Sequence, residues 1–267
     1  MSRAAARRAG VLAYSPRSRE LIRRVLRALG HSPLVFTNLD EFLALGPGAA
    51  HLDLLLLGDM PDTDSQGRAV AACAHDLIGS AVPVLRVPMQ QPGRAVRHRG
   101  AVGGGMVATS PRYFSDLYRV ILSFLESLGF ASTPRQLAWD RYAFHPTERI
   151  VTFNDEKLKL DAVDFDIALE LFYGAGRPVA GAWLTRMLPA GEHGANWHRI
   201  DNLACTIDDL RVALALDGSN GWALEALPGA AYRLENRPPQ RRQPTLARAP
   251  LAAVPKPRRA VPAADLG

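Results

Sequence analysis

Residues 200–234 of the chain, IDNLACTIDDLRVALALDGSNGWALEALPGAAYRL, contain the pattern that decides the fold of its second half. Leucine and isoleucine recur every three or four residues from Leu203 to Leu214, a spacing that predicts an amphipathic helix from about Ile200 to Leu214. After this helix we expect a turn at 217–221, a strand at 222–227, a tight turn at Pro228-Gly229 and a last strand at 230–234. The stretch therefore predicts a helix followed by a β-hairpin.

Two more helices and several short strands are predicted upstream of this stretch. Asp161 is a candidate N-cap for a helix whose apolar stripe runs from Val163 to Phe172 and ends at Gly174. A second helix is expected over 182–187. The strands expected before them are at 139–144 and 150–153, separated by a turn at His145-Pro146.

The first 130 residues alternate short apolar runs with helical stretches. Leu54–Leu57 is continuously apolar, as a strand buried on both faces should be. The predicted strands are 11–14, 34–36, 54–57, 82–87 and a weak fifth at 105–108, and the predicted helices include 20–29 and 116–128. Such alternation predicts a parallel sheet with helices on both faces, in which ligands bind at the carboxyl ends of the strands.

Motifs spread through residues 139–235 follow one another in the order of a known family. They are Tyr142-Ala143-Phe144, Leu160, Asp164-Phe165, Gly176-Arg177-Pro178-Val179, Leu184, Ile207-Asp208-Asp209-Leu210-Arg211, Gly221-Trp222-Ala223-Leu224 and Gly229-Ala230-Ala231-Tyr232-Arg233-Leu234. In this order they resemble the effector domain of OmpR/PhoB-type response regulators. The resemblance implies a winged helix-turn-helix that binds double-stranded DNA, with its third helix in the major groove and the hairpin as a wing over the minor groove.

The residues expected to contact DNA are few, and their surroundings are acidic. The candidates are Arg199, Asn202, Thr206, Arg211 and Arg233. The outward face of the third helix should present Asp201, Asn202, Cys205, Asp208, Asp209 and Val212. Three aspartates on this face oppose the phosphate neutralisation that supplies most of the affinity for DNA. An equal alternative is that Arg211 and Arg233 pair with nearby aspartates.

The first 131 residues are similar to the receiver domain of the same family, but the residues of its chemistry are replaced. Pro16, Gly30, Asp53-Leu54-Leu55-Leu56-Leu57, Pro83 and Ser110-Pro111 match the receiver pattern. In place of the family's acids, phosphoryl-accepting aspartate, hydroxyl and lysine stand Ala13 and Tyr14, Gly58, Pro88 and Ser110. Asp59 lies one residue past the expected nucleophile, and such a slip turns a strand side chain to the opposite face. We therefore expect no phosphorylation and no metal.

Charge divides the 267-residue chain, whose net charge is +6, into three segments. Residues 1–135 hold 16 basic and 10 acidic residues, residues 136–235 hold 9 and 15, and residues 236–267 hold 7 and 1. The last segment has seven prolines and no aromatic residue, which predicts a disordered basic tail. It is either a solvated end or an electrostatic arm for nucleic acid. The predicted division is 1–131 receiver-like domain, 132–138 linker, 139–235 winged helix domain and 236–267 tail.

The expected fold is thus an α/β receiver-like (flavodoxin-like) domain followed by an α+β winged helix-turn-helix domain. Two cysteines and no long apolar run indicate a cytoplasmic protein without a membrane span or a disulfide framework. We expect no catalytic residues, no enzyme activity and no cofactor. The predicted function is DNA-binding transcription regulation without aspartyl phosphorylation, with a homodimer through Asp116 and Arg119 as an option.

Two alternatives remain open. In one, the winged helix has given up DNA, and its acidic face binds a protein such as RNA polymerase or another regulator. In the other, the receiver-like domain senses a small molecule in the vacated pocket near Tyr14 and Ser110. Cys205, expected to face outward, is thin support for a redox switch, because one exposed thiol shows little by itself.

Overall fold

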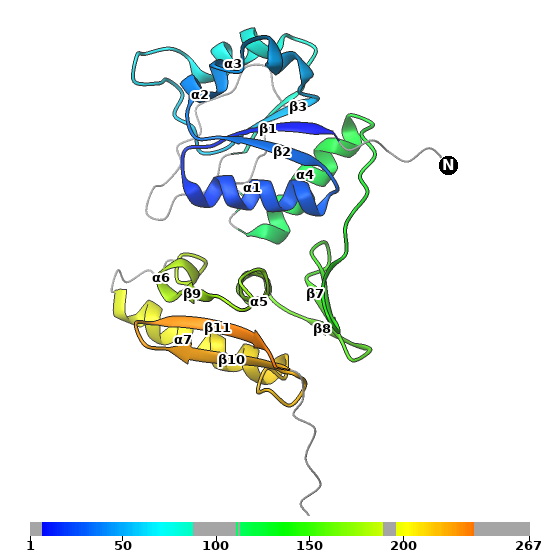
Figure 1. Ribbon diagram of the computed structural model, residues 1–267, viewed down its shortest axis with the longest axis vertical. Helices are drawn as coiled ribbons and strands as arrows, with labels where there is room; N and C mark the ends of the chain where they lie inside the picture. Colours follow the sequence, from blue (N-terminus) through cyan, green and yellow to red (C-terminus); the bar gives the residue numbers. More distant parts are fainter. Residues whose placement is uncertain (1–6, 88–110, 112, 189–195, 238–267) are drawn as a thin grey trace, which may run out of the picture.

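Figure 1 shows a computed structural model of the chain, which describes residues 7–87, 111, 113–188 and 196–237, with the backbone alone for 196–201. A parallel sheet with its helices occupies the upper part of this view, and antiparallel strands with three helices occupy the lower part. No helix in the described part of the chain is long and apolar enough to cross a bilayer.

The N-terminal part is built on a four-stranded parallel sheet with the strand order β2-β1-β3-β4. Its strands are β1 (Arg8–Leu12), β2 (Ser32–Phe36), β3 (Leu54–Leu57) and β4 (Val84–Arg86). All four side chains of β3 are buried, which confirms the prediction of a strand covered on both faces. The strand predicted at 105–108 lies outside the described residues.

Helices cover both faces of this sheet, as predicted. On one face lie α1 (Pro16–Ala28) and α4 (Phe114–Ser127), and on the other lie α2 (Leu39–Leu43), the 3-10 helix η1 (Gly46–His51) and α3 (Val70–Ile78). Leu54 and Leu56 belong to the buried cluster of α1 and α4, whereas Leu55 and Leu57 belong to that of α2 and α3, following the two-residue period of a strand. A four-stranded parallel sheet with flanking helices fits a receiver-like domain.

Two predicted boundaries in this domain are shifted towards the N-terminus. The strand expected at 11–14 is β1, at Arg8–Leu12, and the helix expected from Glu20 begins at Pro16. Ser15 is the N-cap of α1, because its Oγ accepts a hydrogen bond of 3.2 Å from the backbone N–H of Ser18. The first turn of α1 is polar, so apolar periodicity alone did not reveal where the helix begins.

The C-terminal part opens with a four-stranded antiparallel sheet, in the order β5-β6-β7-β8. Its strands are β5 (Leu137–Trp139), β6 (Tyr142–His145), β7 (Ile150–Phe153) and β8 (Glu156–Lys159). The sequence analysis missed β8, whose residues EKLK are mostly polar and exposed. The chain before β5 is held against the end of α1, since the N–H of Arg135 donates to the carbonyl oxygen of Ala28 at 2.7 Å.

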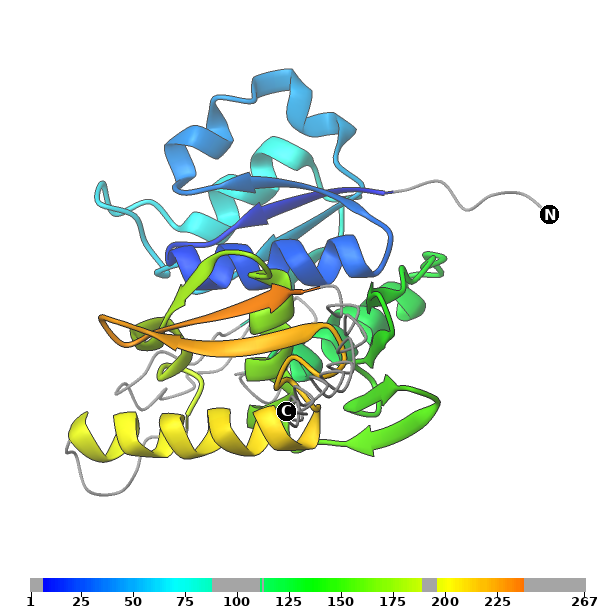
Figure 2. The same cartoon turned by 60° about the horizontal axis from the view of Figure 1, so that its bottom comes forward.

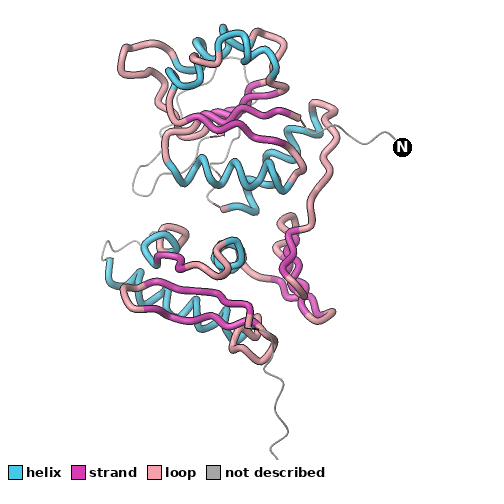
Figure 3. Tube along the Cα trace, in the orientation of Figure 1, coloured by secondary structure: helices cyan, strands magenta, loops and turns pink. Residues whose placement is uncertain are grey.

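Three helices and a three-stranded sheet complete the described part of the chain (Figure 3). The helices are α5 (Ala162–Tyr173), α6 (Gly181–Leu184) and α7 (Asn196–Ala213), and the sheet joins β9 (Pro178–Ala180), β10 (Trp222–Leu227) and β11 (Ala231–Asn236) in the order β10-β11-β9. The Asp161 cap is confirmed: its carboxylate accepts a 2.8 Å hydrogen bond from the N–H of Asp164. β10 has the predicted bounds, whereas α6 ends three residues before the predicted end at Met187.

The core of the C-terminal part forms where α7 meets the other elements. The predicted stripe Leu203, Ile207, Leu210 and Leu214 is buried. Beneath it, the hydroxyl of fully buried Tyr142 donates a 2.7 Å hydrogen bond to the carbonyl oxygen of Leu214, just beyond the end of α7. This bond satisfies one of the carbonyl groups that a helix leaves open at its C-terminus. This packing therefore fixes which side of α7 faces the core, and the opposite side of the helix faces away from it.

Candidate nucleic-acid interface

The outward face of α7 is open to solvent. Figures 1 and 2 show α7 on the side of the molecule away from the parallel sheet. Exposed on this face are Asn202, Ala204, Cys205, Asp208, Asp209 and Val212, the last with 82% of its surface accessible. The aspartates therefore lie on a free convex surface rather than against the receiver-like domain. The side chain of Asp201 lies outside the described residues.

The Arg211 side chain, near the C-terminal end of α7, is held by two contacts. Its Nη1 forms an ion pair with the carboxylate of Asp208, one turn earlier on α7. Its Nε donates a 3.1 Å hydrogen bond to the carbonyl oxygen of Leu224 in β10. The Arg211 side chain thus links α7 to the hairpin, and its charge is shared with an acid.

Arg233 is also paired, although with glutamates rather than with the aspartates named as its alternative partners. Its Nη2 lies 3.3 Å from Glu225, directly across the β10–β11 ladder, and its Nε lies 2.8 Å from Glu235. Arg237 contacts the same two carboxylates. Hydrogen bonds from Arg233 and Arg237 lower the pKa of Glu225. Two arginines and two glutamates balance on this side of the hairpin, so it offers little net positive charge.

The structure places the five predicted DNA contacts as follows. Asn202 is exposed and Thr206 half-buried on α7, and Arg211 is half-buried near the end of this helix. Arg233 is half-buried on β11. The backbone of Arg199 lies in the first turns of α7, and its side chain lies outside the described residues. Of the described candidates, the ion pairs leave Asn202 and Thr206 as the side chains best placed to meet a base edge.

The receiver-like domain has no room for a phosphoryl-accepting side chain at the expected position. A Cβ atom at Gly58 would lie 2.6 Å from the Cβ of Ala13 and 3.3 Å from Cδ1 of Ile22. Contact of the chain with Ala13 therefore fills the place where a carboxylate would stand. Pro88 and Ser110, the other two replacements, lie outside the described residues.

Asp59 has a structural partner instead. Its two carboxylate oxygens lie 3.1 and 3.3 Å from the backbone nitrogen of Ser15, which donates to them at the start of α1. Tyr14, beside it, is 66% exposed and points away from the core. Within the described residues, no group of three or more His, Cys, Asp or Glu side chains is arranged to hold a metal ion.

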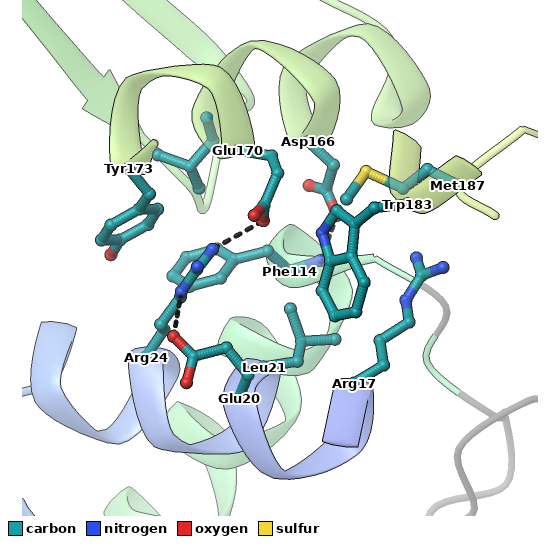
Figure 4. A pocket seen from close by; sticks show the side chains of 11 residues that line it. Arg17, Glu20, Leu21, Arg24, Phe114, Asp166, Glu170, Tyr173, Trp183 and Met187 are labelled. Carbon is teal, nitrogen blue, oxygen red and sulfur yellow. Dashed lines mark hydrogen bonds and ion pairs between the residues drawn. The ribbon is translucent and has the colours of Figure 1, made fainter. Parts of the chain in front are cut away.

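The sequence analysis missed the contact between the two domains, in which Asp166 of α5 is central (Figure 4). Asp166 is 5% exposed and accepts hydrogen bonds from the backbone N–H groups of Phe114 and Ser115, at the start of α4. Arg24 of α1 pairs with Glu170 of α5 at 2.6 Å and lies over the ring of Tyr173. The available signal was Asp166 within the otherwise apolar run Phe165–Leu169.

A second contact ties α4 to the chain just before β7. Arg149 donates to Oγ of Ser115 at 3.1 Å and to the carboxylate of Asp116 at 2.7 Å. Asp116 also accepts from Arg119 within α4, at 2.7 Å. The two residues considered for pairing across a homodimer therefore pair with each other, and Asp116 takes part in the domain contact.

Comparison with known proteins gives distant matches. No family model matches the chain, and no curated protein matches it. Response regulator DrrB of Thermotoga maritima, an OmpR/PhoB homolog, matches with a TM-score of 0.33 and 15% identity, over 86% of this chain and 100% of its own. A redox sensor of the streptococci, from a family evolved from two-component response regulators, matches with a TM-score of 0.34 and 14% identity, over 86% and 99%.

A receiver domain protein of Bacillus halodurans matches with a TM-score of 0.33 and 18% identity, over 45% of this chain and 97% of its own. TM-scores of this size carry no conclusion about what this chain does.

Proposed function

We propose that the chain is a DNA-binding transcriptional regulator of OmpR/PhoB type that acts without aspartyl phosphorylation. The observation that carries the proposal is the free outward face of α7, joined to the β10–β11 hairpin through Arg211. A third helix with an exposed face beside an antiparallel hairpin is the arrangement that a winged helix uses to place a helix in the major groove. The blocked position at Gly58 supports the absence of phosphoryl transfer.

In the proposed DNA complex, different parts of the chain contact the bases and the phosphates. Asn202 and Thr206 of α7 supply hydrogen-bonding groups for base edges, and Arg199, in the sequence of the first turns of this helix, is a further candidate for contact with DNA. Because Arg211, Arg233 and Arg237 share their charge with acids, phosphate neutralisation falls to the six basic residues of 238–267 and to the basic N-terminal domain.

The test is selection of binding sites from random double-stranded DNA by the full chain and by residues 1–237. The proposal expects both to enrich a common sequence, with weaker binding and a shallower salt dependence for residues 1–237, because the tail contributes phosphate contacts. The proposal fails if the full chain enriches no sequence. It fails equally if binding depends on the tail alone and is the same for every sequence.

A second candidate function is favoured by the charge of the same face. Asp208, Asp209 and Val212 are exposed, a mixture of acidic and apolar groups that suits a basic protein surface better than a phosphate backbone. In this function α7 contacts a protein, such as RNA polymerase or another regulator, and the domain does not contact DNA.

Removal of one negative charge from α7 should change the affinity in opposite directions for the two functions. Asp209→Asn removes a negative charge that has no ion pair among the described contacts of α7. A DNA-binding face gains affinity for DNA, by roughly two- to fivefold, from the loss of this repulsion. A face that docks a basic protein loses affinity for that protein, and the DNA measurement stays at background.

A further inference from the structure

We propose that Asp166 is a proton-operated clamp between the two domains: the neutral carboxyl group favours docking of the C-terminal domain on α4, and the carboxylate weakens it. The inference does not depend on DNA binding. It rests on the place of one buried side chain, on what surrounds it and on the backbone groups that it serves.

Asp166 takes the place of an N-cap for a helix in the other domain. The first N–H groups of a helix have no partner within that helix. At the start of α4, Phe114 and Ser115 donate theirs to the two carboxylate oxygens of Asp166, the Ser115 contact being 3.4 Å long. These two amides are therefore protected from water by a residue about fifty positions away in the sequence, so their protection reports on docking.

The side chains around Asp166 are mostly apolar and stabilise its charged form less than water does. Its side chain lies among Phe114, Leu169, Trp183 and Met187, in the contact between α4, α5 and α6 (Figure 4). Burial raises the pKa of Asp166 to about 7, although hydrogen bonds from Phe114 and Ser115 lower it, and the negative charge of Asp116 raises it further. The positive charge of Arg17 lowers the pKa, as the smallest of these causes.

Two of the neighbouring arginines pair with carboxylates other than that of Asp166. Those that face Asp166 or line the same pocket are Arg17, Glu20 and Arg24 of α1, Asp116 of α4, Glu170 and Tyr173 of α5, and Arg149, which reaches Asp116 from before β7. Arg24 lies between Glu20 and Glu170, 2.6 Å from each. Arg149 pairs with Asp116 at 2.7 Å. Within the described part of the chain, neither of these arginines is directed to the Asp166 carboxylate.

The sign of the pH effect follows from linkage. An undocked Asp166 in water has the ordinary pKa near 3.8, and the docked residue has the raised value of about 7. The docked state therefore binds the proton more tightly, and docking is strongest at low pH. Between these two values docking weakens as the pH rises, by up to about tenfold per pH unit, and above the higher value it changes no further.

The experiment is amide hydrogen exchange of the full chain at pH 5, 6, 7 and 8, expressed as protection factors so that the intrinsic pH dependence of exchange is removed. The proposal expects the protection of Phe114 and Ser115 to fall by up to about tenfold per unit between pH 5 and 7 and to level off above that range. In parallel, the carboxyl carbon resonance of Asp166 should titrate near pH 7.

Substitutions assign the effect to one group. Asp166→Asn keeps one oxygen acceptor, for the N–H of Phe114, without the charge, so the protection of Phe114 should be independent of pH. Asp164→Asn removes a carboxylate two residues away on α5, whose pKa is also raised, by burial and by Asp161 and Asp209. This matched control should behave like the unaltered chain.

Three results would overturn the clamp. One is protection of Phe114 and Ser115 that does not change between pH 5 and 8. Another is a pH dependence that persists in Asp166→Asn, because it would then belong to other groups at the interface. The third is a carboxyl resonance of Asp166 that titrates near its ordinary value of 3.8.

Discussion

Gly58 shows how close packing limits the side chain that one position can hold. The backbone at this position lies so close to Ala13 that a Cβ atom would be 2.6 Å from the Cβ of Ala13. An aspartate introduced here has to displace the end of β1 or α1, because its Cβ would also lie 3.3 Å from Cδ1 of Ile22. The close packing of the two strand ends is possible because residue 58 has no side chain.

Replacement of this glycine gives a prediction about stability. Gly58→Asp should lower the free energy of unfolding by about 1–3 kcal/mol, the usual range for overpacking a core, and should not become labelled by acetyl phosphate with Mg²⁺. Urea denaturation and a labelling assay measure the two effects. Gly48→Asp is the control, because a Cβ there meets nothing within 4 Å. An unchanged stability of Gly58→Asp, or efficient labelling, would contradict this account of the pocket.

The elements of the fold differ in how far the sequence alone predicts them. β3 and β10 have the predicted bounds, because a continuous apolar run and an alternating strand between two turns are strong local signals. β8 was missed because EKLK has no apolar face, and its place is decided by pairing with β7. The start of α1 was misplaced because its first turn is polar and a serine cap determines it.

For the candidate interface, the sequence predicts the helix and its exposed face, but not the partners of the arginine side chains beside it. The buried stripe of α7 and its exposed face follow from helical spacing, and both are observed. The pairing of Arg233 with Glu225 depends on the register of the hairpin, and the hydrogen bond from Arg211 to Leu224 depends on tertiary packing. The domain contact at Asp166 joins residues about fifty positions apart, for which no local pattern exists.

The cap of α5 supports a prediction at the scale of the element. Asp161→Ala should destabilise the chain by about 0.5–2 kcal/mol, since the N–H of Asp164 then loses its acceptor. Asp161→Asn, which keeps a side-chain oxygen at the same position, should cost much less. Thermal or urea unfolding of the two variants provides the comparison, and equal losses for both would show that the carboxylate acts through its charge and not as a cap.

Among the described residues, three groups of polar side-chain contacts join the two domains. Asp166 caps α4, Arg24 bridges α1 and α5, and Arg149 joins the start of α4 to the chain before β7. None of these contacts covers the outward face of α7. The outward face of α7 is therefore exposed while the two domains are docked. A change in docking would alter the position of α7 relative to the N-terminal domain, and this face would stay exposed.

The bridge made by Arg24 can be tested against a neighbour on the same helix. Arg24→Ala leaves Glu170 without its partner in a largely buried setting, so the protection of Phe114 and Ser115 should fall at least about tenfold. Arg23→Ala is the matched control, because Arg23 pairs with Glu20 within α1. Equal effects of the two substitutions would mean that the ion pair across the domains contributes nothing to docking.

In the proposed function α7 and the β10–β11 hairpin read a DNA groove, and the ratio of affinities for specific and non-specific DNA tests this reading. Residues 1–237, without the basic tail, are titrated at one salt concentration against the sequence enriched by selection and against a scrambled sequence of the same length. The account predicts affinities that differ by about a thousandfold or more, and a ratio that collapses when Asn202 and Thr206 are both changed to alanine. A ratio near one for the unaltered protein would contradict it.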